Sequence, residues 1–199
     1  MDVLVLYASS EGQTLKVAEK ATTVLRSRGH DVEAVDAVAN GAVRLSDFDA
    51  VILASRVHAG RHHPAIVSFA RTNRMELEEM LNAFLSVSMS AAMHTPKDQQ
   101  QLEQYRHHFV QATGWLPQRY VDVAGARLYT RHNRFTRWIL GMVDGHRYDT
   151  SKDHEFTDWG KLVAFLNEWI GNAEAQYGAG FSGAQPTPAN TNTAAEVTP

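Results

Sequence analysis

The sequence predicts an α/β protein: a three-layer sandwich in which helices cover both faces of a parallel β-sheet. Apolar runs of strand length alternate with helical patterns about five times in the first 170 residues. The central runs, 3–7 and 50–54, are apolar throughout, as expected for parallel strands buried on both faces. In such a sheet the ligand binds at the carboxyl ends of the strands. The loops after strands one, three, four and five are therefore the candidate site.

The five predicted strands are short, mostly apolar runs. They cover residues 3–7, 31–35, 50–54, 83–87 and 120–124. The fifth run contains Asp122, and a polar residue within a strand favours a position at the edge of the sheet.

Helical patterns separate these strands. Residues 14–28 place apolar side chains on one face at helical spacing, and Gly29 ends this helix. Pro64 opens the next helix, where its missing N–H costs nothing. Residues 98–113 form a polar surface helix, and residues 157–170 form a closing helix with an apolar face.

The composition excludes several kinds of chemistry. The 199 residues include no cysteine, which rules out a thiolate nucleophile, a disulfide framework and Cys-ligated zinc. No apolar stretch approaches the roughly 20 residues of a transmembrane helix, and the N-terminus shows no signal-peptide pattern. The net charge of −3 argues against a general nucleic-acid binder.

The charge is unevenly distributed. Between residues 125 and 148 there are five arginines and a single acid, a local excess of about +4. The segment 171–199 has no Lys or Arg and is rich in Ala, Gly, Thr, Asn and Pro, so it is predicted to be disordered. The predicted organisation is one domain over 1–170, with a basic insert at 125–150, followed by this tail.

A polar loop with one glycine joins the first strand to the first helix. Its composition suits a phosphate, because hydroxyls donate, a glycine lets the backbone approach, and a helix N-terminus presents free N–H groups. The alternative is a loop that merely caps the helix. The chain has neither Gly-x-Gly-x-x-Gly nor Gly-Lys-Ser/Thr here, which favours a mononucleotide. The loop residues are Ser9, Ser10, Glu11, Gly12, Gln13 and Thr14.

This loop resembles the phosphate loop of flavodoxins, usually written Thr-x-Thr-Gly-x-Thr. Ser9 replaces the first threonine and Glu11 the second, and an acid before the glycine is a feature of bacterial quinone-dependent protoporphyrinogen oxidases. Three further segments are similar to that family in order and spacing: 124–129, the arginine-rich stretch to Trp138, and 156–159.

The resemblance implies a flavodoxin-like five-stranded sheet in the order 2-1-3-4-5 and an FMN-dependent oxidoreductase. It implies oxidation of protoporphyrinogen IX to protoporphyrin IX in heme biosynthesis, with electrons passed to menaquinone or ubiquinone. The expected location is cytoplasmic, peripheral on the inner face of the cell membrane. Besides the phosphate loop, the residues expected to bind FMN are Ser55, Val57, His58, Ala59, Gly60, Ser88, Met89, Ser90 and Gly125.

The two loops expected to flank the flavin ring, 55–63 and 88–93, contain no Trp, Tyr or Phe. An open flavin face admits a substrate, which favours an enzyme over a one-electron carrier. Arg56 or Arg61 is expected to stabilise reduced flavin or bind substrate carboxylates, and His58 is the candidate proton acceptor. Three histidines in this loop suggest a metal site, but no carboxylate lies nearby in the sequence, so no metal is predicted.

Within the basic insert, residues 133–143 form an amphipathic helical pattern. Phe135 and Trp138 fall on its apolar face, and Arg134 and Arg137 lie opposite, as in helices that bind a membrane surface. The other possibilities are packing on the protein's own sheet, a homo-oligomer interface or a lid over the porphyrin. The residues assigned to substrate or membrane contact are Arg127, Arg131, Arg134, Phe135, Arg137 and Trp138.

Three other functions remain open at this stage: a flavodoxin-type electron carrier, a flavin-dependent quinone or NAD(P)H reductase of another substrate, and a domain that has lost FMN. The near-neutral net charge argues against the carrier, because carriers are typically strongly acidic. Glu11, in a loop that is expected to bind a phosphate, keeps the last possibility open.

Overall fold

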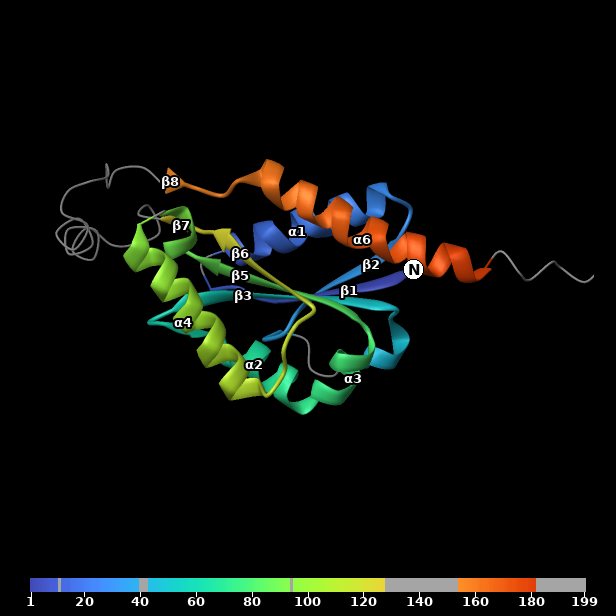
Figure 1. Ribbon diagram of the computed structural model, residues 1–199, viewed down its shortest axis with the longest axis horizontal. Coiled ribbons are helices and arrows are strands. Elements are labelled where there is room, and N and C mark those ends of the chain that lie inside the picture. Colours follow the sequence, from blue (N-terminus) through green and yellow to red (C-terminus); the bar gives the residue numbers. More distant parts are fainter. Residues whose placement is uncertain (11, 40–42, 94, 128–153, 182–199) are drawn as a thin grey trace, which may run out of the picture.

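A computed structural model describes residues 1–10, 12–39, 43–93, 95–127 and 154–181. Its main sheet has the strand order β2-β1-β3-β5-β6, all in parallel (Figure 1). These strands are β1 (Asp2–Ala8), β2 (Asp31–Asp36), β3 (Ala50–His58), β5 (Leu81–Ser88) and β6 (Arg119–Ala124). The predicted fold class and strand order are confirmed, and Asp122 lies on an edge strand as expected.

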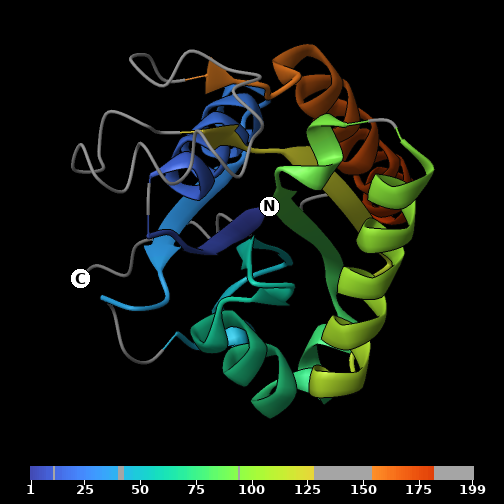
Figure 2. The same ribbon diagram turned by 90° about the vertical axis from the view of Figure 1, so that its left-hand side faces the viewer.

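Helices cover both faces of the sheet (Figures 1 and 2). On one face lie α1 (Gln13–Ser27) and α6 (Trp159–Phe181), and on the other lie α2 (Pro64–Thr72), α3 (Arg74–Glu79) and α4 (Pro96–Thr113). Alternate residues of each central strand face the two layers: Val3 and Val5 pack towards α1 and α6, whereas Leu4 and Leu6 pack towards α2. The sheet therefore has a hydrophobic core on each side.

The segment 55–63, predicted to be a loop, contains a β-hairpin instead. Strand β3 continues to His58, and β4 (Arg61–His62) turns back to pair with it in antiparallel fashion. The two turn residues, Ala59 and Gly60, both have positive φ angles, 47° and 76°, as in a type I′ turn. The polar side chains of this segment give no strand pattern in the sequence, because the hairpin forms through pairing of the backbone.

Several short elements also depart from the prediction. These are the 3-10 turns η1 (Leu45–Asp47) and η2 (Ser90–Ala92), helix α3, and a two-stranded sheet of β7 (Ala126–Arg127) and β8 (His154–Glu155). The predicted boundary at residue 170 is wrong for helix α6, which continues through 171–181. Ala173 is buried there, and Glu174 binds Arg28 and His30 at the end of α1, so packing against α1 holds this stretch in the helix.

The predicted amphipathic helix at 133–143 and the tail from 182 onwards lie outside the described residues. So do Glu11, Arg131, Arg134, Phe135, Arg137 and Trp138. In the part of the chain that is described, no helix is both long and apolar enough to cross a membrane.

A buried histidine makes the stability of this fold depend on pH. His62 packs against the rings of Phe84 and Phe109 and contacts Ser86 Oγ at 3.1 Å. Burial lowers the pKa of His62 to about 4, so only the unfolded chain binds this proton between about pH 4 and 6.5. Stability is therefore lost as the pH falls through this window.

Between pH 7 and pH 5 the free energy of unfolding should fall by about 2 kcal/mol because of His62. Urea unfolding at the two pH values measures this, and the His62→Phe variant should lose that part of the pH dependence. The exposed His107 is the control, since His107→Gln should keep the wild-type slope. An unchanged slope in His62→Phe would contradict the assignment.

Candidate functional site

A cleft opens at the carboxyl ends of β1, β3 and β5, where the sequence places the site. The cleft has a volume of about 90 Å³ among the described residues. It brings together nine of the residues predicted to bind FMN or to act in catalysis, and adds Val87 and Ala126, which were not predicted. The predicted residues are Ser9, Gln13, Thr14, Arg56, Val57, His58, Ser88, Met89 and Gly125.

The start of helix α1 forms one wall of this cleft. Gly12, with φ 92°, is the residue immediately before the helix, and no described side chain caps the helix there. Ser9 Oγ accepts the N–H of Gly12 itself at 3.0 Å, and the Lys16 N–H bonds to the Gly12 carbonyl at 3.1 Å. The Lys16 bond is the first of the helix, so the N–H groups of residues 13–15, which come before it, have no acceptor within the helix. This turn is therefore suited to bind an anion, and the alternative of a helix-capping loop is not supported.

Arg56 adds a positive charge beside the loop after β1. Its Nε donates to Ser10 Oγ at 2.8 Å, which links the end of β3 to the loop after β1. Arg56 and the uncapped first turn of α1 thus lie at the same cleft. A guanidinium and free backbone N–H groups are both typical ligands of phosphate.

The three histidines of the hairpin segment serve different purposes. His62 is buried in the core, and His63 caps α2, its Nδ1 accepting the Ala65 N–H at 3.2 Å. Burial, and secondarily the Arg56 guanidinium, lower the pKa of His63, which favours the neutral form needed for this cap. His58 alone of the three lines the cleft, and its side chain is exposed. The described residues hold no group of three potential metal ligands.

Six described residues that were predicted to bind the cofactor are not among those that line the cleft: Ser10, Gly12, Ser55, Ala59, Gly60 and Ser90. Ser55 is fully buried, and its Oγ accepts the His63 N–H at 2.9 Å. Ala59 and Gly60 form the hairpin turn, and Ser90 Oγ donates to Gln101 Oε1 at 2.9 Å on helix α4. Val57 and Met89 line the cleft at the ends of β3 and β5, and no Trp, Tyr or Phe is among the described lining residues.

A buried hydrogen-bond chain joins the phosphate loop to the segment before α6. Gln13 Nε2 donates to Thr157 Oγ1 at 2.7 Å, and Thr157 Oγ1 donates to the Ala124 carbonyl at 2.7 Å. Glu155 Oε1 lies 3.4 Å from the same Gln13 nitrogen, and its other oxygen pairs with Lys16 at 3.3 Å. Neither Glu155 nor Thr157 was predicted to belong to the site, although Thr157 lies in the segment 156–159 that resembles the family.

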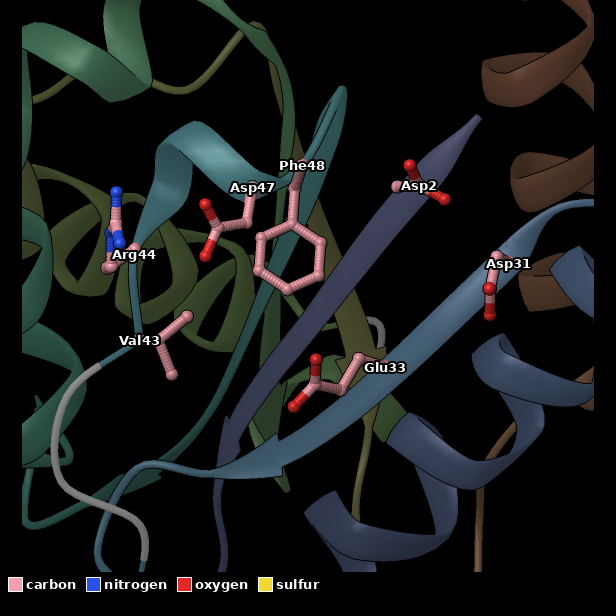
Figure 3. A pocket seen from close by; sticks show the side chains of 7 residues that line it. All are labelled: Asp2, Asp31, Glu33, Val43, Arg44, Asp47 and Phe48. Carbon is pink, nitrogen blue, oxygen red and sulfur yellow. The ribbon is translucent and has the colours of Figure 1, made fainter.

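A second, larger hollow of about 360 Å³ lies near the start of β1 (Figure 3). Its lining comes from β1, β2 and the segment around η1. Four of its residues are acidic and one is basic: Asp2, Asp31, Glu33, Asp47 and Arg44. Because like charges repel, this hollow is unsuited to a phosphate.

The sheet order and the anion-binding loop after its first strand define a flavodoxin-like α/β protein. A sequence model of the flavodoxin domain family matches residues 4–154, and the chain belongs to this family.

Curated relatives align with the greater part of this chain. Protoporphyrinogen IX dehydrogenase [quinone] of Escherichia coli K12 is 26% identical over 171 residues, covering 84% of this chain and 94% of the relative. A protein of the same name from Leishmania major is 26% identical over 173 residues, covering 83% of this chain and 73% of the relative.

Solved structures agree on the fold. Oxidised flavodoxin 1 from Bacillus cereus aligns with a TM-score of 0.50 at 15% identity, covering 86% of this chain and 98% of that one. Rubredoxin oxygen:oxidoreductase from Desulfovibrio gigas aligns with a TM-score of 0.55 at 15% identity. That alignment covers 88% of this chain but only 37% of the larger protein.

Proposed function

We propose that this chain binds FMN and oxidises protoporphyrinogen IX to protoporphyrin IX in heme biosynthesis, passing the electrons to menaquinone or ubiquinone. The observation that carries the proposal is the uncapped first turn of α1 with Arg56 bound beside it, at the carboxyl end of the sheet. The names of the curated relatives supply the substrate and the electron acceptor.

The described residues fit FMN in two respects. The backbone N–H groups at the start of α1 and the Arg56 guanidinium would hold the phosphate. Gln13 Oε1 is buried and has no hydrogen-bond partner among the described residues, so a ligand hydroxyl is the donor that we propose for it. The flavin hydroxyl chain offers such donors. When bound, FMN would supply the acceptor for the electrons removed from the substrate.

The protein groups beside the proposed flavin have separate roles. Val57 and Met89 would flank the ring and shield it from water, and neither is an aromatic residue that would stack on the face open to a substrate. Arg56 balances negative charge near the phosphate loop, and the exposed His58 at the end of β3 takes up a proton from the substrate. Arg61, also exposed on this hairpin, is available to substrate carboxylates.

The basic insert is proposed to bring the enzyme to the membrane that holds the quinone. Its arginines and aromatic residues form the amphipathic pattern at 133–143, and Arg127 begins the same segment. The full chain should float with vesicles that contain anionic lipid and not with vesicles of phosphatidylcholine alone. Equal recovery of the chain with both kinds of vesicle, or recovery with neither, would contradict attraction of the basic insert to anionic lipid. A homo-oligomer is the alternative use of this segment, and sedimentation of the lipid-free chain tests it.

The central test is direct. The purified protein should be yellow, and anaerobic addition of protoporphyrinogen IX should bleach the flavin absorbance while porphyrin fluorescence rises; a quinone analogue should then restore the yellow colour. A colourless protein that takes up no added FMN would overturn every redox function. A flavin that protoporphyrinogen leaves oxidised would point to a reductase of another substrate.

Replacing His58 by alanine should slow flavin reduction by protoporphyrinogen about a hundredfold, because general acid–base groups typically contribute that much or more. Stopped-flow absorbance at several pH values measures the rate. His108 on α4 is an exposed control, and His108→Ala should leave the rate unchanged. Flavin reduction at the wild-type rate in His58→Ala would remove His58 from the mechanism.

A further inference from the structure

We propose that Thr157 is a positioning residue for the cofactor: it holds the Gln13 side-chain amide so that Oε1 accepts a hydrogen bond from a hydroxyl of the bound flavin chain. This inference rests on the proposed binding of FMN. It concerns a contact between residues 144 positions apart in the sequence.

The hydrogen-bonding capacities of the groups determine which way the amide points. The Ala124 carbonyl can only accept, so its 2.7 Å bond uses the hydroxyl proton of Thr157. Thr157 Oγ1 must therefore accept in its contact with Gln13, and the group that faces it must be the amide NH2. The Glu155 carboxylate, near the same nitrogen, selects the same orientation.

This orientation leaves the amide oxygen as an unused acceptor. Gln13 is only 6% exposed, it lines the cleft, and its buried Oε1 has no hydrogen-bond partner in the part of the chain that is described. A buried carbonyl without a donor is costly, and few survive in folded proteins without a purpose. Lys16 Nζ pairs with Glu155 and Arg56 Nε bonds to Ser10, and no described group donates to Gln13 Oε1. The donor is therefore expected from the ligand.

Thr157 is well placed to set this geometry. It is 9% exposed and lies just before α6, while Ala124 ends strand β6 next to the cleft residue Gly125. The backbone of Gly125 is itself fixed, because its N–H bonds to the Ser88 carbonyl at 2.8 Å. Thr157 thus ties the Gln13 amide to a rigid part of the sheet, which pre-organises the acceptor before the ligand binds.

The experiment compares two ligands that differ only in the hydroxyls. One is FMN, and the other is an FMN analogue in which a plain pentyl chain replaces the ribityl chain, keeping the ring and the phosphate. Both are titrated by flavin fluorescence into the full chain stripped of flavin. The wild type should prefer FMN by about tenfold, the effect of one hydrogen bond to a buried acceptor. Thr157→Val and Gln13→Met should lose this preference.

Two variants separate positioning from a general loss of structure. Thr157→Ser keeps the hydroxyl and should restore the preference. Thr22→Val makes the same change at a buried threonine of α1 whose Oγ1 bonds only to Ala18 within the helix, so it should keep the wild-type ratio. The ratio of the two affinities is unaffected by a loss of stability that weakens both ligands equally, and Gln13→Met supplies the test should Thr157→Val not fold.

The outcomes are distinct. A wild type with no preference between the two ligands, or a Thr157→Val variant that keeps the full preference, would overturn the role of Thr157. A wild type that binds neither ligand would instead overturn the proposed binding of FMN.

Discussion

Replacing Gly12 by valine is expected to weaken FMN binding about a hundredfold. Gly12 has φ 92° and ψ −11°, a conformation that costs an L-residue roughly 1–2 kcal/mol and a β-branched residue more. Valine would relieve this strain by moving the loop. The free N–H groups that follow Gly12 would then no longer point at the phosphate, and about 2.7 kcal/mol of lost binding corresponds to a hundredfold in affinity. Titration of the flavin-free protein with FMN measures the effect.

The same helix supplies a matched control. Gly29, just beyond the other end of α1, has φ 87°, and a Cβ placed there meets no atom within 4 Å. Gly29→Val therefore introduces similar backbone strain far from the cleft. It should lower the free energy of unfolding by about 1–2 kcal/mol and leave the FMN affinity unchanged. If both variants bound FMN like the wild type, the first turn of α1 would not be the phosphate site.

The sheet could be predicted because its central strands are apolar on both faces. Short apolar runs of strand length, as in β1 and β3, are typical of parallel strands buried on both faces, and 0–1% exposure from Val3 to Leu6 agrees with this. The hairpin of β3 and β4 could not be predicted in this way. Its residues are mostly polar and its turn is Ala59–Gly60, so neither apolar alternation nor an Asn-Gly signal marks it.

The end of α6 was missed for a different reason. The sequence beyond residue 170 is rich in small residues and has no basic residue, which is typical of disorder. The helix continues because Glu174 meets Arg28 and His30, residues that are distant in the sequence. Only the tertiary structure places these charges together, so local composition could not reveal the contact.

The candidate site also contains residues that could be predicted from the sequence and one that could not. Loop residues such as Ser9 and Arg56 could be predicted, because a parallel sheet brings the carboxyl ends of its strands to one edge. Thr157 could not, since it reaches Gln13 from outside that set of loops. The segment 156–159 resembles the family, but this resemblance assigned no role to Thr157, and its role becomes visible only from the amide and carbonyl that it joins.

Replacing Phe84 by alanine is expected to cost about 4 kcal/mol of stability, a large part of the 5–15 kcal/mol typical of a folded domain. Phe84 is fully buried on β5. Its ring stacks on Phe109 at 4.1 Å between centroids and meets His62 edge-on at 5.0 Å and Trp115 at 6.4 Å. These rings are large and rigid, so the surroundings cannot collapse into the space left by the side chain. Urea unfolding at pH 7 measures the loss.

The exposed Met75 is the control, because its side chain is 72% exposed and Met75→Ala should change stability by less than about 0.5 kcal/mol.

The substitution Phe84→Ala should affect FMN binding at the cleft less than it affects the stability of the fold. Phe84 lies on the same strand as Ser88 but four residues earlier, and the strand is paired on both sides along this length. Folded Phe84→Ala should therefore bind FMN within a few-fold of the wild type. A loss below about 1 kcal/mol would mean that the core is less tightly packed than the ring contacts indicate.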